Sequence, residues 1–147
     1  MYLRELHARY RLRRLSGWSL PLGPLEAPRE SARIFVTLFR DEVVEVGGLL
    51  CLSTRHHVLA YHELSRGTVD ATMLHPREVF KAALLSNASS VIVGHNHPSG
   101  DITPSPDDRA VTARIAAAGV VMGIELADHV IVSADGKYLS FKEAGWL

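Results

Sequence analysis

The 147-residue sequence has a single cysteine and no long apolar segment. Cys51 therefore has no partner for an internal disulfide, and it lies in the apolar run 49–52, where we expect a buried, unreactive thiol. No run of about 18 apolar residues is present to span a membrane, and residues 1–15 lack the apolar stretch of a signal peptide. These absences predict a cytoplasmic protein that does not associate with a membrane.

The sequence also lacks net charge, because 16 Lys and Arg residues balance 16 Asp and Glu residues. A neutral chain argues against a protein whose whole surface serves nucleic-acid binding. Positive charge is nevertheless concentrated in residues 1–15, whose arginines are Arg4, Arg9, Arg11, Arg13 and Arg14. Apolar residues near helical spacing predict an amphipathic basic helix there. Its apolar side could pack on the domain or on a second copy of the chain, and its arginines could contact nucleic acid weakly.

Glycine and proline concentrate in residues 16–28, which we interpret as a linker. The sequence thus divides into an N-terminal arm and linker over residues 1–28 and a single domain over residues 29–147. With 47% apolar residues overall, a domain of this length can bury a substantial core without structural metal. Any bound metal is therefore expected to serve function rather than folding.

The pattern of apolar residues in the domain predicts helices that alternate with short strands. The expected helices cover residues 30–41, 76–86 and 109–119, the last one closed by Gly119. The expected strands cover residues 45–52, 57–63, 67–71, 91–94, 122–126, 129–133 and 137–141. The first three read as an antiparallel run, and residues 134–136 as the final turn. This order predicts an α/β (α+β) fold, a mixed sheet flanked by helices.

Candidate chemistry is concentrated between residues 94 and 108. His95 and His97 follow a strand, and their side chains share one face because a strand has a period of two residues. Asp108 lies eleven residues beyond His97 in the first turn of the next helix, and it could complete a three-ligand zinc site. Three protein ligands leave a fourth position for a water molecule, as in catalytic zinc sites.

Asp108 also has a purely local interpretation. With Ser105 as N-cap and Pro106 as the first helical residue, Asp108 takes the position of the acidic residue in a capping box. A metallohydrolase further needs a carboxylate as base, and Glu45, just before the strand at 45–52, is our candidate. The residues alone leave Glu42, Glu63 and Glu78 as competitors.

The pattern of Glu45, His95-Asn96-His97, seven residues, Ser105, two residues and Asp108 resembles the JAMM metalloprotease signature. The strings GTVDATMLHPREVFKAALLSNASSVIVGHNHPSGDITPSPDD and GIELADHVIVS, and residues 30–141 as a whole, resemble the RadC family, also called DUF2466 or UPF0758. The resemblance implies the JAB/MPN fold, which is related to the cytidine-deaminase arrangement.

The resemblance also implies a role for each motif residue. His95, His97 and Asp108 would hold Zn²⁺, Glu45 would activate a water molecule, and Ser105 would donate to the developing oxyanion. The implied activity is that of a zinc metallopeptidase or isopeptidase acting on a protein or peptide substrate. The sequence departs from full-length RadC proteins in that residues 1–28 contain no helix-hairpin-helix signature.

Three other functions could be associated with parts of this sequence. A zinc nucleobase deaminase needs a P-C-x-x-C motif, which one cysteine excludes. A DNA-associated repair protein would use the arginine-rich arm, with a minor or relict metal site. A scaffold without activity would be expected to lack the ligands, which are present here. Asp128 and His129 could in addition form a hydrogen bond to a metal ligand, and exposed strand edges could support a homo-oligomer.

Overall fold

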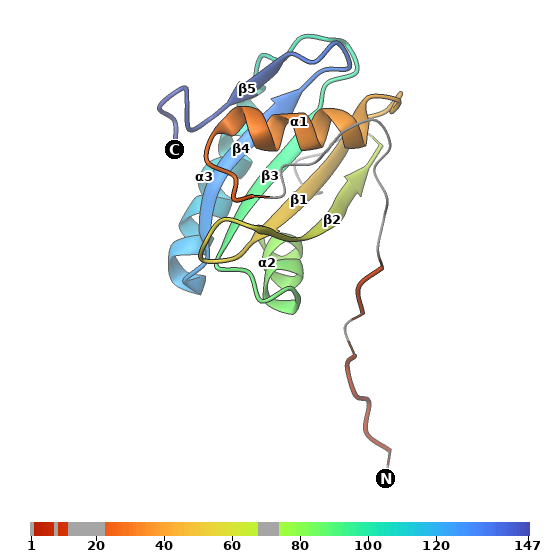
Figure 1. Cartoon of the computed structure of the whole chain (residues 1–147), viewed down its shortest axis with the longest axis vertical. Coiled ribbons are helices and arrows are strands. Elements are labelled where there is room, and N and C mark those ends of the chain that lie inside the picture. The colour runs from red at the N-terminus through yellow and green to blue at the C-terminus, as the bar shows by residue number, and fades with distance from the viewer. Residues whose placement is uncertain (1, 8, 12–22, 68–73) are drawn as a thin grey trace.

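The computed structural model of the chain describes residues 2–7, 9–11, 23–67 and 74–147. Within these residues three helices and five strands follow one another in the order α1, β1, β2, α2, β3, α3, β4, β5 (Figure 1). The helices are α1 (Pro28–Phe39), α2 (Pro76–Leu85) and α3 (Pro106–Met122). The strands are β1 (Val46–Leu52), β2 (Val58–Arg66), β3 (Ser90–Asn96), β4 (Glu125–Val132) and β5 (Tyr138–Ser140).

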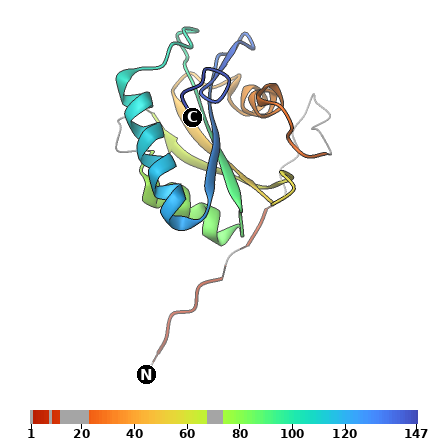
Figure 2. The same ribbon diagram turned by 90° about the vertical axis from the view of Figure 1, so that its left-hand side faces the viewer.

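The strands form one mixed sheet in the spatial order β2-β1-β3-β4-β5. All neighbouring pairs are antiparallel except β3 and β4, which run parallel and are joined by α3. Helix α1 covers one face of the sheet, and α2 and α3 cover the other (Figure 2). This confirms the predicted α/β class with a mixed sheet flanked by helices, an arrangement consistent with a JAB/MPN fold.

Both faces of the central strands are buried, which explains why β1 reads as a continuous apolar run rather than an alternating one. Leu49 and Cys51 of β1 pack beneath α2 and α3, whereas Leu50 and Leu52 pack beneath α1. Cys51 is fully buried, and burial raises the pKa of its thiol to about 11, as expected for an unreactive cysteine.

Helix α1 lies close to β3 because β3 has a glycine at the crossing point. A Cβ atom on Gly94 would lie 2.4 Å from the ring of the fully buried Phe35. The helix begins at Pro28, two residues before the predicted start, and Leu25 before it is already buried in the core. The division of the chain at residue 28 remains a prediction.

Two predicted strands near the C-terminus prove to be one. Residues 122–126 and 129–133 were expected to be separate, but β4 runs without a break from Glu125 to Val132. The register against β3 shifts between Val91 and Ile92, so Ala127 is an extra residue, a β-bulge rather than a turn. The predicted turn at 134–136 does connect β4 to β5.

The prediction that Gly119 closes α3 is wrong. The helix continues to Met122, and Gly123, with a φ of 67°, forms its left-handed C-cap. Gly119 lies inside the helix where the chain turns back on itself, and a Cβ there would lie 2.5 Å from the carbonyl oxygen of Ile124. Close packing, not helix termination, explains this glycine.

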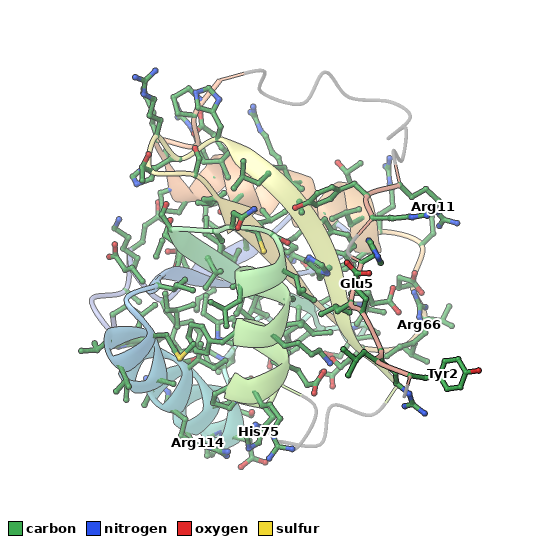
Figure 3. The ribbon with its side chains drawn as sticks, turned by 90° about the horizontal axis from the view of Figure 1, so that it is seen from below. Tyr2, Glu5, Arg11, Arg66, His75 and Arg114 are labelled. Carbon is green, nitrogen blue, oxygen red and sulfur yellow. The ribbon has the colours of Figure 1, made fainter. Side chains whose placement is uncertain are left out.

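The predicted basic helix is not present in the described part of the arm. Residues 2–7 and 9–11 have no regular secondary structure and are exposed, and the side chains of Tyr2 and Arg11 point outward (Figure 3). Residues 8 and 12–15 of the predicted helix lie outside the described residues, as do residues 68–71 of the third predicted strand. A search of the described residues for a helix long and apolar enough to cross a membrane finds none.

Candidate metal centre

The end of β3 brings the two predicted histidine ligands together. His95 lies within β3, and His97 follows its last residue and extends the pairing with β4, since its N–H donates to the carbonyl of Val132 at 2.9 Å. The Nε2 atoms of the two rings lie 3.0 Å apart. The prediction that both imidazoles share one side of the strand is therefore confirmed.

Asp108 reaches both histidines from the first turn of α3. Its Oδ1 lies 3.3 Å from Nε2 of His95, and its Oδ2 lies 3.7 Å from Nε2 of His97. It also completes a capping box: its N–H donates to Oγ of Ser105 at 3.0 Å, and its Oδ2 accepts from the Ser105 N–H at 2.8 Å. The two interpretations left open by the sequence are thus compatible, because one carboxylate caps the helix and faces the histidines.

The group His95, His97 and Asp108 could hold a metal ion, since each residue offers one ligand atom and these atoms all lie within 4.8 Å of one another. Tetrahedral zinc with bonds of about 2.0–2.1 Å places neighbouring ligand atoms about 3.3 Å apart. The two Nε2 atoms lie 3.0 Å apart, and Oδ1 and Oδ2 of Asp108 lie 3.3 Å from Nε2 of His95 and 3.7 Å from Nε2 of His97, respectively. Two imidazole nitrogens and one carboxylate this close together are a donor set that fits a zinc ion.

A buried chain of hydrogen bonds fixes which nitrogen of His95 carries a proton. The Thr112 hydroxyl donates to the Asp108 carbonyl at 2.5 Å, so its oxygen accepts from Nδ1–H of His129 at 2.6 Å. Nε2 of His129 is then an acceptor for Nδ1–H of His95 at 2.9 Å. This leaves the lone pair of Nε2 of His95 directed at Asp108 and His97, as a metal ligand requires.

His97 is held in the same tautomer by a separate contact. Its Nδ1 lies 2.6 Å from the backbone carbonyl of Asp101, and a carbonyl can only accept a hydrogen bond. Nδ1 therefore carries the proton, and Nε2 faces the other two ligand atoms. The Asp101 carbonyl belongs to the loop between β3 and α3, so one role of this loop, residues 98–104, is to orient the His97 ring.

The charges at the centre favour a cation. Burial acts to raise the pKa of Asp108, but its close contacts with the His95 and His97 side chains outweigh burial and hold that pKa well below its usual range. The Asp108 carboxylate also raises the pKa of His97, because it favours a second proton on Nε2 of that ring. By contrast, complete burial holds the pKa of His129 well below its ordinary value, so this ring stays neutral. A carboxylate that attracts a proton to these rings attracts a metal cation for the same electrostatic reason.

Glu45 lies beside the same group. Its Oε1 is 3.8 Å from Nε2 of His97, and both residues line a pocket of about 310 Å³. The other residues lining this pocket are Leu74, Ser105, Asp107, Asp108 and Val111. The three competing glutamates lie elsewhere: Glu42 and Glu63 form ion pairs with Arg66, and Glu78 forms one with Lys81.

Ser105 contributes to the pocket wall from the N-cap of α3. Its Oγ accepts a hydrogen bond from the Asp108 N–H, and Ser105 is an exposed residue, so the hydroxyl can donate its own proton into the pocket. All five residues of the predicted motif thus meet in one place, although they come from three separate parts of the chain.

Sequence reasoning found one supporting residue and missed another. The predicted hydrogen bond from the 128–129 pair to a ligand is confirmed for His129, whereas Asp128 accepts from Ser140 Oγ and from two backbone N–H groups instead. Thr112 was missed, and its only signal is that it lies one helical turn after Asp108.

The arginine residues of the arm are placed only in part. Arg4, Arg9 and Arg11 are exposed, and Arg13 and Arg14 lie outside the described residues. Contact between this arm and nucleic acid remains a prediction, as does self-association of the chain.

The geometry agrees with comparisons to known proteins. The family model for the RadC-like JAB domain matches residues 25–146. The UPF0758 protein of Xanthomonas axonopodis pv. citri (strain 306) is 46% identical over 123 residues, which cover 84% of this chain and 54% of that protein. The UPF0758 protein of Thermotoga maritima is 50% identical over 103 residues, covering 70% of this chain and 46% of that protein. The chain spans about half the length of these curated relatives, and it belongs to the RadC family of JAB-domain proteins.

Proposed function

We propose that this chain is a zinc-dependent metallohydrolase of the JAMM type that cleaves an amide or isopeptide bond in a protein or peptide substrate. The observation that supports this most strongly is the convergence of three ligand atoms, a carboxylate and a hydroxyl at one pocket. Two nitrogen ligands and one oxygen ligand suit zinc, and three protein ligands are characteristic of catalytic rather than structural zinc sites.

His95, His97 and Asp108 would hold the zinc ion. When bound, zinc lowers the pKa of a water molecule to about 7 and polarises the carbonyl of the scissile bond. The protein contributes the fixed orientation of the ligands. Thr112 and His129 hold one imidazole through side-chain hydrogen bonds, and the Asp101 carbonyl holds the other.

Glu45 is the general base in this proposal. Its carboxylate lies on the pocket wall 3.8 Å from Nε2 of His97, where it can accept the proton of the attacking water. The same oxygen can return that proton to the amine that leaves when the amide bond breaks. A carboxylate suits both steps because it acts as base in the first and as acid in the second.

Ser105 is the oxyanion donor. Its hydroxyl accepts from the Asp108 N–H through a lone pair and can donate its own proton to the carbonyl oxygen of a substrate as negative charge develops there. The helix N-cap fixes this hydroxyl in advance, so no reorganisation is needed during reaction.

The proposal is tested with zinc-loaded protein purified without a histidine tag. The substrates are a pool of internally quenched peptides and branched peptides joined through the ε-amino group of lysine. We expect the wild type to cleave members of this set and Glu45→Gln to lose at least about 100-fold in rate while it retains zinc. Glu78→Gln, on the surface of α2, is the matched control and keeps full activity. Cleavage by Glu45→Gln at the wild-type rate would contradict the proposal.

A further inference from the structure

Asn96 lies between the two histidine ligands, but its side chain serves a different part of the chain. It is the last residue of β3 and is only 4% exposed. Because side chains alternate along a strand, its amide is directed away from the face that carries His95. Nothing in the metal centre described above uses this amide.

Both ends of the Asn96 amide are hydrogen-bonded to backbone on either side of Glu45. Oδ1 accepts from the N–H of Val46 at 2.6 Å, and Nδ2 donates to the carbonyl of Val44 at 3.0 Å. Glu45 is the residue between these two groups. The N–H of Gly67 donates to the carbonyl of Glu45 itself at 2.9 Å. The backbone that carries the Glu45 carboxylate is thus held at three consecutive residues.

The Asn96 side chain replaces backbone pairing at the point where β1 and β3 separate. The last backbone pair of these strands is Gly47 with His95, and the next would be Val46 with Asn96. There the Asn96 side chain, not its backbone, accepts from the Val46 N–H, and the residue just before Val46, Glu45, lines the pocket. An aliphatic side chain could make neither bond.

We propose that Asn96 is a positioning residue that fixes the Glu45 carboxylate relative to the ligand group His95, His97 and Asp108. Since both sequence neighbours of Asn96 are ligands, the base and the ligands share one short rigid segment. The catalytic consequence rests on the function proposed above, whereas the positioning itself is measurable without any activity. Misplacement of a catalytic group by about 1 Å can lower a rate by about 100-fold. A rate loss of up to this size is therefore expected when Asn96 no longer positions Glu45.

Hydrogen exchange of backbone amides tests the positioning directly. In zinc-loaded Asn96→Ala we expect the Val46 amide to exchange at least about 10-fold faster, and the Gly67 amide to accelerate with it because the Glu45 carbonyl is no longer held. Asn96→Asp keeps an acceptor for Val46 but loses the donor to Val44, so it should largely preserve protection at Val46. Val91→Ala, in the core at the other end of β3, is the control for general destabilisation. In this variant the exchange rates of the Val46 and Gly67 amides should not rise more than those of other amides.

A double-mutant cycle tests the catalytic role on the same peptide pool. We expect Asn96→Ala to lower kcat about 10–100-fold with little change in KM, and to cause no further loss in the Glu45→Gln background. Unchanged exchange at Val46 and Gly67, or a loss that persists in full without Glu45, would overturn the inference. If the wild type cleaves nothing, the proposed function fails separately, and the exchange rates at Val46 and Gly67 alone decide whether Asn96 holds the Glu45 segment.

Discussion

At the scale of single residues, the metal centre depends on which nitrogen of each histidine carries a proton. Complete burial keeps His129 neutral, and its contacts with Thr112 and His95 direct the lone pair of Nε2 of His95 at the other ligands. If a metal binds as proposed, His129 and Thr112 would act on it through His95. Two consequences are measurable, one on pH-dependent stability and one on metal affinity.

The first consequence concerns His129 in metal-free protein. Its folded-state pKa lies well below the value of about 6.5 in the unfolded chain, so below pH 6.5 the unfolded state binds one more proton. The free energy of unfolding should therefore fall by up to about 1.4 kcal/mol per pH unit as pH drops below 6.5. His129→Gln should remove this part of the slope. Urea unfolding of the wild type and His129→Gln between pH 7 and 5, in excess chelator, measures how the free energy of unfolding changes with pH. Identical slopes for the two proteins would contradict a lowered pKa of His129.

The second consequence concerns zinc affinity. Thr112→Val conserves shape but removes the acceptor for Nδ1–H of His129, so the orientation of His95 is no longer fixed. We expect zinc to bind about 10–100-fold more weakly, the range typical when the hydrogen bonds that orient a ligand histidine are disturbed. Thr112→Ser, which keeps the hydroxyl, should remain within a few-fold of the wild type. Competition with a chromophoric chelator gives both affinities, and equal affinity of the valine and serine variants would refute the role of Thr112.

At the scale of secondary structure, the site exists because α3 connects the parallel strands β3 and β4. The helix begins beside the end of β3, which brings Ser105 and Asp108 to the histidines, and its second turn places Thr112 against His129 of β4. The far end of α3 must therefore return closely to the start of β4. Gly119 makes this return possible, since its missing side chain leaves room for the Ile124 carbonyl.

The close contact at Gly119 predicts whether replacing this glycine with alanine stabilises or destabilises the protein. Helix propensity alone favours alanine over glycine by about 1 kcal/mol, but a Cβ at position 119 would lie 2.5 Å from the Ile124 oxygen. We expect Gly119→Ala to destabilise the protein by about 1–3 kcal/mol, because backbone must move. Ala117→Gly, at an exposed position of the same helix, should cost about 1 kcal/mol and shows the propensity effect without a clash. An increase in stability for Gly119→Ala in urea unfolding would contradict the packing argument.

The sequence predicted the order and class of the elements well because apolar periodicity and capping residues are local signals. Ser105 and Pro106 mark the start of α3 as expected. The predicted element boundaries are wrong where a contact between residues distant in the sequence determines the local structure. Ala127 resembles a break between two strands but is a bulge within β4, and Gly119 resembles a helix end but is a packing contact.

The candidate site was predictable to different degrees for different residues. The two-residue period of a strand predicted that His95 and His97 lie together, whereas the choice of Glu45 over three other glutamates required the family resemblance. The side chain of Asn96 is hydrogen-bonded to the backbone of Val46 and Val44, which precede it in the sequence by 50 and 52 positions. No pattern in a single sequence indicates hydrogen bonds between residues so far apart. Contacts of this kind emerge only from the fold.

At the scale of the whole molecule, the chain combines a domain that carries the group His95, His97 and Asp108 with an arm that carries five of its 16 Lys and Arg residues. Arg4, Arg9 and Arg11 are exposed, so their charge is available to a polyanion. The domain spans about half the length of the curated relatives. Contact with nucleic acid is therefore a property to test on the arm separately from the metal centre.

We expect weak binding of the chain to duplex DNA that falls steeply with salt, because each phosphate contact releases counterions. Deletion of residues 1–15 should abolish it, and His97→Ala should leave it intact. Fluorescence anisotropy of a labelled duplex at several salt concentrations is the measurement. Binding that is unaffected by the deletion, or that is lost in His97→Ala, would refute a role for the arm.

The most direct test of the central claim is the zinc content of protein purified without a histidine tag, measured by elemental analysis. We expect about one zinc per chain in the wild type and none in His97→Ala or Asp108→Asn. Asp108→Asn is decisive because an amide oxygen can still accept the Ser105 N–H and cap α3 while the negative charge is lost. Wild-type protein without zinc, or zinc retained in both variants, would show that Asp108 only caps its helix and would contradict the metal centre.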